Sequence, residues 1–299
     1  MPLSLEMKDS PKVSIIVSNY NTSDLVNGAL ESIVLTAGDV AYDVMIIDDA
    51  STDGGLTRID GKYKQDRRFT FVQNERNVGF PAMNIARDRM HGTYLMMLDS
   101  DARLVSGALR TLLTFMEAHP DAGAATANLH NADGSVQHYY RRLMTPTLGF
   151  YTTVLGRFID KYLLGLRHYK FYHYDHLDTT HDVALEQVPT ACLIMRREAL
   201  GSRIVDPDFH LFVDVDLCHR LYDRGYKVYL VAEALAIHLK SRSFGKRESV
   251  WRRREYYRSI GIYFEKHYPL WAPVMRIVLW LDRLMRSCMW HTIGREPIR

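Results

Sequence analysis

The first 130 residues alternate short apolar runs with amphipathic stretches, and this alternation restricts the fold more than any other feature of the chain. Short runs rich in β-branched residues are typical of strands that are buried on both faces of a sheet. The runs predicted to be strands are 13–17, 42–47, 69–72, 94–98 and 122–127, and the predicted helices are 25–34, 79–90 and 106–118. The sequence therefore predicts an α/β fold with a parallel sheet that carries helices on both faces.

Polar clusters directly follow three of the predicted strands. The clusters are Asn-Tyr-Asn at 19–21, Asp-Asp at 48–49 and Asp-Ser-Asp at 99–101. Because the carboxyl ends of parallel strands meet at one edge of a sheet, we expect these side chains to form one site. A dinucleotide-binding fold would place a glycine-rich turn after the first strand, but residues 18–23 contain no glycine. Any bound phosphate must be neutralised in another way, for which a divalent cation held by carboxylates is suited.

Asp99 and Asp101 are the predicted ligands of that cation. Two carboxylates at i and i+2 at a strand end can reach one ion, and Mg²⁺ or Mn²⁺ would bridge diphosphate oxygens there. The alternative is that both residues only cap the following helix. Of Asp48 and Asp49, one could accept a hydrogen bond from the imide N–H of uracil or thymine, while the other stabilises the turn. His238 is either a third metal ligand or a structural histidine.

A further pair of carboxylates, Asp214 and Asp216, precedes a predicted helix over 217–224. We expect Asp216 to lie at the helix N-terminus, where a negative charge is favourable. Asp214 is predicted to lie just outside the helix, next to the apolar residues of 209–212. Apolar surroundings raise the pKa of a carboxyl group, as a general base near neutral pH requires. Asp214 is therefore the candidate base.

The charge of the chain is distributed unevenly. The 299 residues carry a net charge of +3, but residues 240–299 carry 14 basic and 5 acidic side chains, a net charge of +9, which leaves −6 for the rest. We predict two helices after residue 246, split near Pro269, whose aromatic and basic residues suit an anionic membrane surface. Two alternatives remain open: the helices pack on the catalytic domain, or they pair in a homodimer. The acidic body argues against nucleic acid as a partner.

Other features narrow the class and the location of the protein. Its three cysteines, Cys192, Cys218 and Cys288, are too few for a disulfide framework and lack C-x-x-C spacing, so we expect a reducing compartment. Residues 1–12 lack the apolar core of a signal peptide. A run of ~18 uncharged apolar residues, the length of a membrane span, is missing as well. We expect a cytoplasmic protein that associates peripherally with the inner face of the cell membrane.

Five motifs occur in an order and spacing that point to a known family. They are VSIIVSNYN (13–21), IIDDASTD (46–53), NERNVGFPAMN (74–84), LDSD (98–101) and FHLFVDVDL (209–217). Over roughly residues 11–268, the chain resembles the inverting family-two glycosyltransferases of the GT-A fold. The segments 133–135 (Asp-Gly-Ser), 141–142 (Arg-Arg), 145–146 (Thr-Pro) and 264–268 (FEKHY) resemble its rhamnosyltransferase-like branch. The resemblance implies a Rossmann-like, mixed and mostly parallel sheet flanked by helices, with a C-terminal helical extension.

The resemblance implies two groups of binding residues besides the catalytic base, which matches Asp214. The group that binds the nucleotide sugar, with the base held by Tyr20 and Asp49, comprises Ser18, Tyr20, Asp49, Asn77, Asp99 and Ser100. The group that binds Mn²⁺ or Mg²⁺, with Asp101 as the more direct ligand, comprises Asp99, Asp101 and His238. The chain departs from the family pattern at Val213, where glutamate is usual, and at Pro189-Thr190, where a Ser-Gly pair is usual.

The resulting prediction is a metal-dependent, inverting glycosyltransferase. It would move a sugar from a UDP- or dTDP-linked donor, with dTDP-rhamnose implied by the branch, to a hydroxyl of a glycan or lipid-linked acceptor in cell-surface polysaccharide synthesis. We expect a GT-A catalytic domain at 1–245, with a nucleotide-sugar half at 11–127 and an acceptor half at 128–245, and then the basic helical tail at 246–299. The alternative, favoured by Val213, is a non-catalytic sugar-nucleotide-binding or scaffold protein of the same fold.

Overall fold

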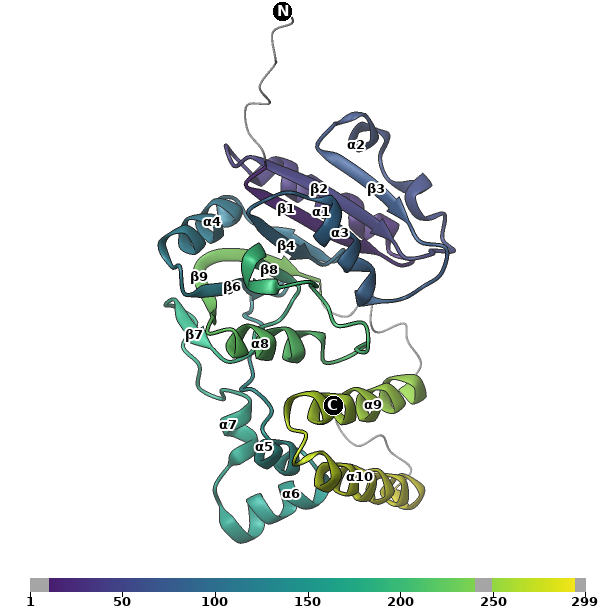
Figure 1. Ribbon diagram of the computed structural model, residues 1–299, viewed down its shortest axis with the longest axis vertical. Coiled ribbons are helices and arrows are strands. Elements are labelled where there is room, and N and C mark those ends of the chain that lie inside the picture. The colour runs from purple at the N-terminus through teal and green to yellow at the C-terminus, as the bar shows by residue number, and fades with distance from the viewer. Residues whose placement is uncertain (1–10, 240–248, 294–299) are drawn as a thin grey trace, which may run out of the picture.

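Strand pairing in the first hundred residues follows the predicted pattern. The structure, a computed structural model, describes residues 11–239 and 249–293 (Figure 1). Parallel pairing joins four strands in the order β3-β2-β1-β4, with bounds β1 (Val13–Asn19), β2 (Tyr42–Asp48), β3 (Phe69–Gln73) and β4 (Tyr94–Leu98). Asn19 lies opposite Asp48 in this register, so the polar clusters that follow β1 and β2 share one edge of the sheet.

The sheet continues with strands from later in the chain. β8 runs antiparallel between β4 and β6, while β9 pairs in parallel with β6 and antiparallel with β5 and β7. The bounds are β5 (Ala102–Leu104), β6 (Ala122–His130), β7 (Val183–Leu185), β8 (Cys192–Arg196) and β9 (Lys227–His238). β8 is antiparallel to its neighbours, unlike the parallel strands that the alternation predicts. Nearly every side chain of β8 is buried, so its sequence does not indicate whether the strand pairs in parallel or antiparallel. The mixed sheet with flanking helices agrees with the implied GT-A architecture.

The sheet separates two apolar cores. One core contains α1 (Ser23–Thr36), α2 (Gly61–Gln65) and α4 (Ala108–Ala118), and the other contains α3 (Asn84–Arg89), α8 (Val213–Asp223) and parts of the C-terminal helices. Figure 1 shows α1 and α8 on opposite sides of the strands. A 3-10 turn, η2 (Phe80–Met83), precedes α3, so the single helix expected over 79–90 is divided.

Short helices that the sequence did not predict fill the segment between β6 and β7. They are α5 (Pro146–Tyr151), α6 (Val154–Ile159), the π-helical η3 (Asp160–Leu164) and α7 (His168–Tyr172). Thr145 and Thr153 cap α5 and α6, since their hydroxyls accept hydrogen bonds from the first turn of each helix. Helices of five or six residues are too short to show an apolar period, which is why the sequence pattern missed them.

The C-terminal tail forms the two predicted helices, α9 (Ser249–His267) and α10 (Ala272–Ile293), with Pro269 between them. The predicted boundary at residues 245 and 246 lies outside the described residues. Asp282 ties α10 to the body, because it is buried and accepts hydrogen bonds from Val154 N and Tyr257 Oη, both at 2.7 Å. One face of α10 therefore packs on the rest of the protein. In the described part of the chain, every helix is too short or too polar to span a bilayer.

Candidate active site

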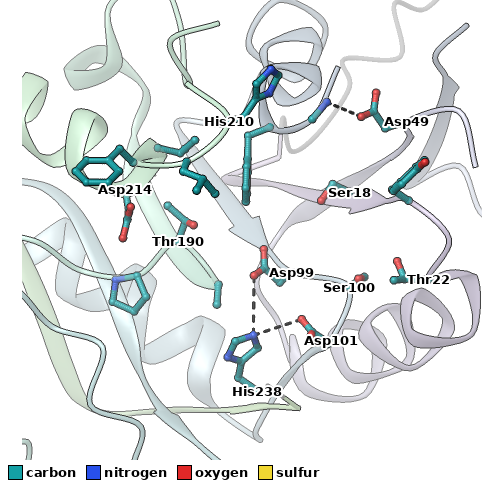
Figure 2. Close-up of a pocket in the computed structure, with 18 of the residues that line it drawn as sticks. Ser18, Thr22, Asp49, Asp99, Ser100, Asp101, Thr190, His210, Asp214 and His238 are labelled. Atoms are coloured by element: carbon teal, nitrogen blue, oxygen red, sulfur yellow. Dashed lines mark hydrogen bonds and ion pairs between the residues drawn. The ribbon is translucent and has the colours of Figure 1, made fainter. Parts of the chain in front are cut away.

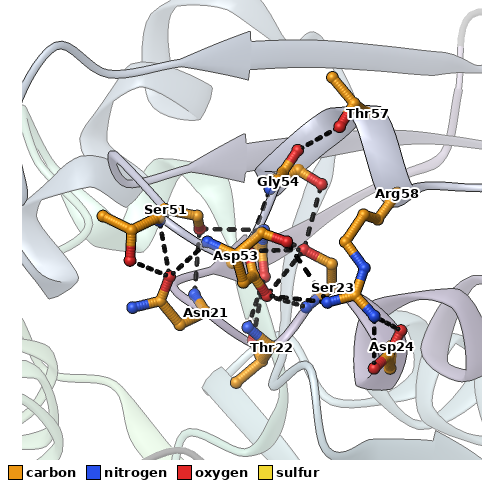
Figure 3. A network of polar contacts seen from close by, with 12 residues as sticks. Asn21, Thr22, Ser23, Asp24, Ser51, Asp53, Gly54, Thr57 and Arg58 are labelled. Atoms are coloured by element: carbon orange, nitrogen blue, oxygen red, sulfur yellow. Dashed lines mark hydrogen bonds and ion pairs between the residues drawn. The ribbon is translucent and has the colours of Figure 1, made fainter.

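The turns after β1 and β2 are held together by a dense polar network (Figure 3). Asn19 Nδ2 donates to Asp48 Oδ1 at 2.7 Å, and the Ser51 hydroxyl donates to the same oxygen. Asp53 accepts from the backbone and the hydroxyl of Ser23 at the start of α1, at 3.4 and 3.2 Å. Asp48 and Asp53 therefore form part of the scaffold, and Ala50 between them takes a left-handed backbone with φ of 61°.

Asp49 holds the loop that leads to α3. Its carboxylate accepts hydrogen bonds from Asn74 Nδ2 at 2.9 Å, from Val78 N at 3.0 Å and from Gly79 N at 2.6 Å. These bonds fix the loop segment that carries Asn77 beside the sheet edge. Both carboxylate oxygens of Asp49 are engaged in this way, and its contact with a nucleotide base stays a prediction.

A cavity of about 430 Å³ opens at the carboxyl ends of β1, β2 and β4. We call it the donor-side cavity. Figure 2 shows residues from distant parts of the chain turned toward it, including Ser18, Asp99 and Asp214. It gathers every residue singled out from the sequence as a site residue: Ser18, Tyr20, Asp49, Asn77, Asp99, Ser100, Asp101, Asp214 and His238.

Asp99, Asp101 and His238 form an acidic corner of the donor-side cavity. His238 is the last residue of β9, rather than one that follows the strand, and pairing with β5 brings it beside the two carboxylates. Its Nε2 lies 3.4 Å from Asp101 Oδ1 and 4.0 Å from Asp99 Oδ2. One potential ligand atom from each residue lies within 4.8 Å of the others. His238 Nδ1 contacts Gln137 Oε1 at 2.9 Å, and this contact orients the ring.

The donor set of this corner fits a hard divalent cation. Asp101 is 1% exposed, yet both of its carboxylate oxygens lack a hydrogen-bond partner among the described residues. Burial, opposed by His238, raises the pKa of Asp99 to about 6. Burial would also raise the pKa of Asp101, but the nearby His238 outweighs it and lowers that pKa. Buried carboxylate oxygens that accept no hydrogen bond are available as ligands of a divalent cation.

Asp214 lies in the first turn of α8, rather than outside that helix as predicted, because α8 begins at Val213. Phe212, with a left-handed φ of 66°, turns the chain sharply into the helix. Gln187 Nε2 donates to Asp214 Oδ2 at 2.7 Å. Burial raises the pKa of Asp214, while Gln187, the Val215 backbone and Arg141 act in the opposite direction. The helix thus presents a partly desolvated carboxylate to the cavity.

Asp216, two residues later, has a structural position. Its carboxylate accepts from Arg220 Nε at 2.8 Å and contacts His267 Nε2 at 3.0 Å, which joins α8 to α9. It lies outside the lining of the donor-side cavity. Only the first of the two carboxylates therefore faces the site.

Several lining residues were missed from the sequence as site candidates. Gln187 lies in the loop before β8, Arg141 lies in the segment before α5, and His210 lies before α8. Arg141 belongs to a quoted motif, but the motif assigns it no role. Gln187 and His210 carry no local pattern, so only the folded chain brings them to the site.

Comparison with known sequences identifies relatives of the chain. Residues 14–200 match the family described as Glycosyl transferase family 2. TuaG of Bacillus subtilis (strain 168), named for teichuronic acid biosynthesis, is 28% identical over 230 residues, 76% of this chain and 78% of TuaG. Poly(ribitol-phosphate) beta-glucosyltransferase of Bacillus spizizenii is 32% identical over 101 residues, 33% of this chain. The chain spans only 16% of that protein and 34% of an uncharacterized glycosyltransferase of Haemophilus influenzae.

Solved structures resemble this chain in fold. The mannosyltransferase PcManGT of Pyrobaculum calidifontis, solved with GDP-Man and Mn²⁺, has a TM-score of 0.57 and 16% identity, and the match covers 96% of this chain and 77% of that one. Residues 1–349 of Staphylococcus aureus TarS, solved with UDP-GlcNAc, have a TM-score of 0.55 and 19% identity, over 86% of this chain and 67% of that one. These likenesses establish the GT-A fold.

Proposed function

The chain belongs to glycosyl transferase family 2, and we propose that it is a metal-dependent, inverting enzyme that transfers a sugar from a nucleotide diphosphate to an acceptor hydroxyl. The observation that carries the proposal is the position of Asp214, which lines both the donor-side cavity and a second cavity beside it. A base at such a junction can meet both substrates. The relatives named for teichuronic acid and poly(ribitol-phosphate) support a place in cell-surface polysaccharide synthesis.

Asp214 is the proposed general base. Its carboxylate would take the proton from the acceptor hydroxyl while that oxygen attacks the anomeric carbon, on the face opposite the diphosphate. The bond between the anomeric carbon and the diphosphate oxygen breaks, the nucleoside diphosphate leaves, and the configuration at the anomeric carbon inverts. The raised pKa of Asp214 supports this role, because a base with a pKa closer to neutrality accepts a proton more readily.

The end of the donor-side cavity away from Asp214 is the proposed binding site of the nucleotide. Tyr20 and Asp49 would hold the base, and Ser18, Asn77 and Ser100 would contact other parts of the nucleotide sugar. The proposed metal ligands are Asp99, Asp101 and His238. A bound Mn²⁺ or Mg²⁺ would offset the negative charge of the diphosphate. The dTDP-rhamnose donor implied by the branch motifs is the first one to test.

We also propose that the chain divides into the three functional parts that its sequence predicts. Residues 11–127 would hold most of the nucleotide sugar, residues 128–245 would add the base and part of the acceptor site, and the tail would complete the acceptor site. The lining of the second cavity supports this division, since it includes residues of α9 and α10.

A donor-panel assay tests the proposed activity. The purified chain is incubated with Mn²⁺ and UDP-, dTDP- and GDP-linked sugars, and released nucleoside diphosphate is measured with and without EDTA. We expect metal-dependent release from at least one donor. Donor binding without any release, even with added cell-surface glycans, would instead favour the non-catalytic binding protein that Val213 suggests.

The pH dependence of transfer is expected to report the environment of Asp214. A base must be deprotonated, so activity is present above its pKa and is lost as the pH falls through it. Burial has raised that pKa, and the Gln187 amide opposes the shift. The variant Q187M removes this opposition, so the acid limb of kcat/KM should move to higher pH while much of the activity at alkaline pH is retained. The exposed Q65M on α2 is the control, and an unmoved acid limb in Q187M would show that Asp214 is not the titrating base.

We further propose that the tail binds the inner, anionic face of the cell membrane. The face of α10 turned away from the body is apolar, with Ile277 62% and Trp280 59% exposed. Directly before the helix, Leu270 is 91% and Trp271 56% exposed. α10 contacts α6, and Figure 1 shows these two helices together at the end of the molecule opposite β3. Apolar side chains beside basic ones suit the interface of an anionic bilayer.

Cosedimentation tests the membrane proposal. The whole chain is expected to pellet with phosphatidylglycerol vesicles and to do so less at high salt, since each basic residue near such a surface contributes about 1 kcal/mol. The variant W271Q/W280Q should lose most of this binding, whereas L35Q, on the exposed face of α1, should not. If W271Q/W280Q binds vesicles normally but dissociates a dimer in analytical ultracentrifugation, the apolar face is a dimer contact instead.

A further inference from the structure

A second cavity, of about 620 Å³, lies beside Asp214 on the side away from the acidic corner of the donor-side cavity. We call it the acceptor-side cavity. It shares Arg141, Gln187, Phe212 and Asp214 with the donor-side cavity, so the two spaces meet at the proposed base. Segments far apart in the chain enclose it, including α7, α9 and α10, which lie near one another in Figure 1.

Arginine dominates the lining of the acceptor-side cavity. The guanidinium groups come from five positions in different segments: Arg141, Arg157, Arg252, Arg253 and Arg286. Asp214 is the only carboxylate among the residues that line it, so the lining carries a formal charge of +4. Such an excess of one sign in a concave, partly buried space attracts ligands of the opposite charge.

Most of this charge is not compensated by nearby acids. Arg286 is paired with Asp282 at 2.9 Å. Arg141, Arg157 and Arg252, in contrast, have no carboxylate within 4.0 Å anywhere in residues 11–239 and 249–293. The Arg157 guanidinium lies over the ring of Tyr169, 3.8 Å from its centroid, which holds the group in place without neutralising it.

His173 also lines the acceptor-side cavity. Burial, together with Arg141 and Arg157, lowers the pKa of this histidine to about 4. The ring is therefore neutral at physiological pH and adds no charge of its own. Tyr169 and Tyr172 line the same space, with ring centroids 4.3 and 5.0 Å from the His173 ring.

We propose that the acceptor-side cavity binds a phosphate or diphosphate ester carried by the acceptor, next to the hydroxyl that Asp214 would deprotonate. This inference rests on the proposed function and names the acceptor class. Guanidinium groups bind phosphate oxygens in pairs of parallel hydrogen bonds. A single carboxylate would neutralise only one of the excess charges, whereas a diphosphate brings two or three.

Calorimetry with inorganic pyrophosphate tests the site directly. The titration is made in EDTA, so that no cation occupies Asp99, Asp101 and His238. The whole chain is compared with R157Q/R252Q, which removes two unpaired cavity arginines, and with R254Q. Arg254 is the matched control, because it is exposed on the same helix as Arg252 and lies outside the cavity lining.

We expect R157Q/R252Q to bind pyrophosphate about tenfold or more weakly than the parent chain, and R254Q to bind it equally well. Sodium glucuronate, which carries a single charge, should bind at least about tenfold more weakly than pyrophosphate to the parent. Equal pyrophosphate affinity in all three proteins would overturn the inference, and so would glucuronate binding as tightly as pyrophosphate. Unchanged unfolding midpoints in both variants exclude a general loss of structure.

A vesicle arm separates a phosphate ester in the cavity from a lipid headgroup at the surface. If R157Q/R252Q loses binding to phosphatidylglycerol vesicles but keeps pyrophosphate affinity, the arginines serve the membrane and the cavity assignment is wrong. Loss of pyrophosphate affinity with vesicle binding retained supports the cavity. Donor binding with Mn²⁺ is measured separately on the parent chain, so failure of the proposed glycosyl transfer and failure of this inference give different results.

Discussion

Replacing Asp214 by asparagine should reduce sugar transfer by about 10²–10⁴-fold, the usual contribution of general base catalysis. The asparagine keeps the shape of the side chain and its contact with Gln187, but it cannot accept the proton of the acceptor hydroxyl. Donor affinity should change little, because the donor-binding residues lie at the other end of the cavity. Steady-state rates and donor calorimetry on the same D214N preparation check both halves of the expectation.

The control for D214N is D223N, which removes a carboxylate that is 62% exposed at the far end of the same helix. D223N should transfer sugar at the parental rate. Turnover of D214N within a few-fold of the parent would move the base elsewhere. Asp216 could not take its place, since its carboxylate is tied to Arg220 and His267 and lies outside the cavity.

Replacing Asp101 by alanine should abolish metal-dependent donor binding. Without this ligand, the cation would be held by Asp99 and His238 alone, and the diphosphate would keep most of its uncompensated charge. We expect calorimetry with Mn²⁺ and the preferred donor to show a loss of about 100-fold or more in affinity, in line with the loss of a charged ligand.

D24A provides the comparison for D101A, since Asp24 is an exposed carboxylate on α1 that pairs only with Arg58 among the described residues. It should bind the donor as the parent does. If D101A binds the donor in Mn²⁺ as tightly as the parent chain does, the acidic corner is not the metal site.

The donor side of the site was predictable because it is built from local patterns. Ser18, Asp49 and Asp99 each lie at the end of an apolar run, and parallel pairing brings such ends to one edge. Periodicity identified these runs as strands, and their order determined which polar clusters would meet. His238 was a weaker prediction, because a lone histidine at the end of a strand shows no partner until β9 pairs with β5.

The acceptor side could not be predicted in the same way. Arg157 lies in a six-residue helix, Arg252 lies in a helix of the tail, and neither follows a motif for ligand binding. Their approach to Asp214 depends on how α10 packs against α5, α6 and α9, and these are tertiary contacts between distant segments. Gln187 was missed for the same reason, since its hydrogen bond to Asp214 joins a loop to a helix that begins 26 residues later.

The order of the lining residues along the chain has a consequence for how such enzymes diversify. Every residue that lines the acceptor-side cavity lies at position 141 or later, whereas the nucleotide end of the donor-side cavity is built from β1, β2 and β4 and the turns after them. A genetic crossover near residue 130 would therefore exchange the whole lining of the acceptor-side cavity, and His238 with it, while it keeps the turns after β1, β2 and β4. In a hybrid joined there with a relative, Asp99 and Asp101 would come from the first parent and the residue at position 238 from the second, so only pairs of relatives that both carry histidine there would keep this corner.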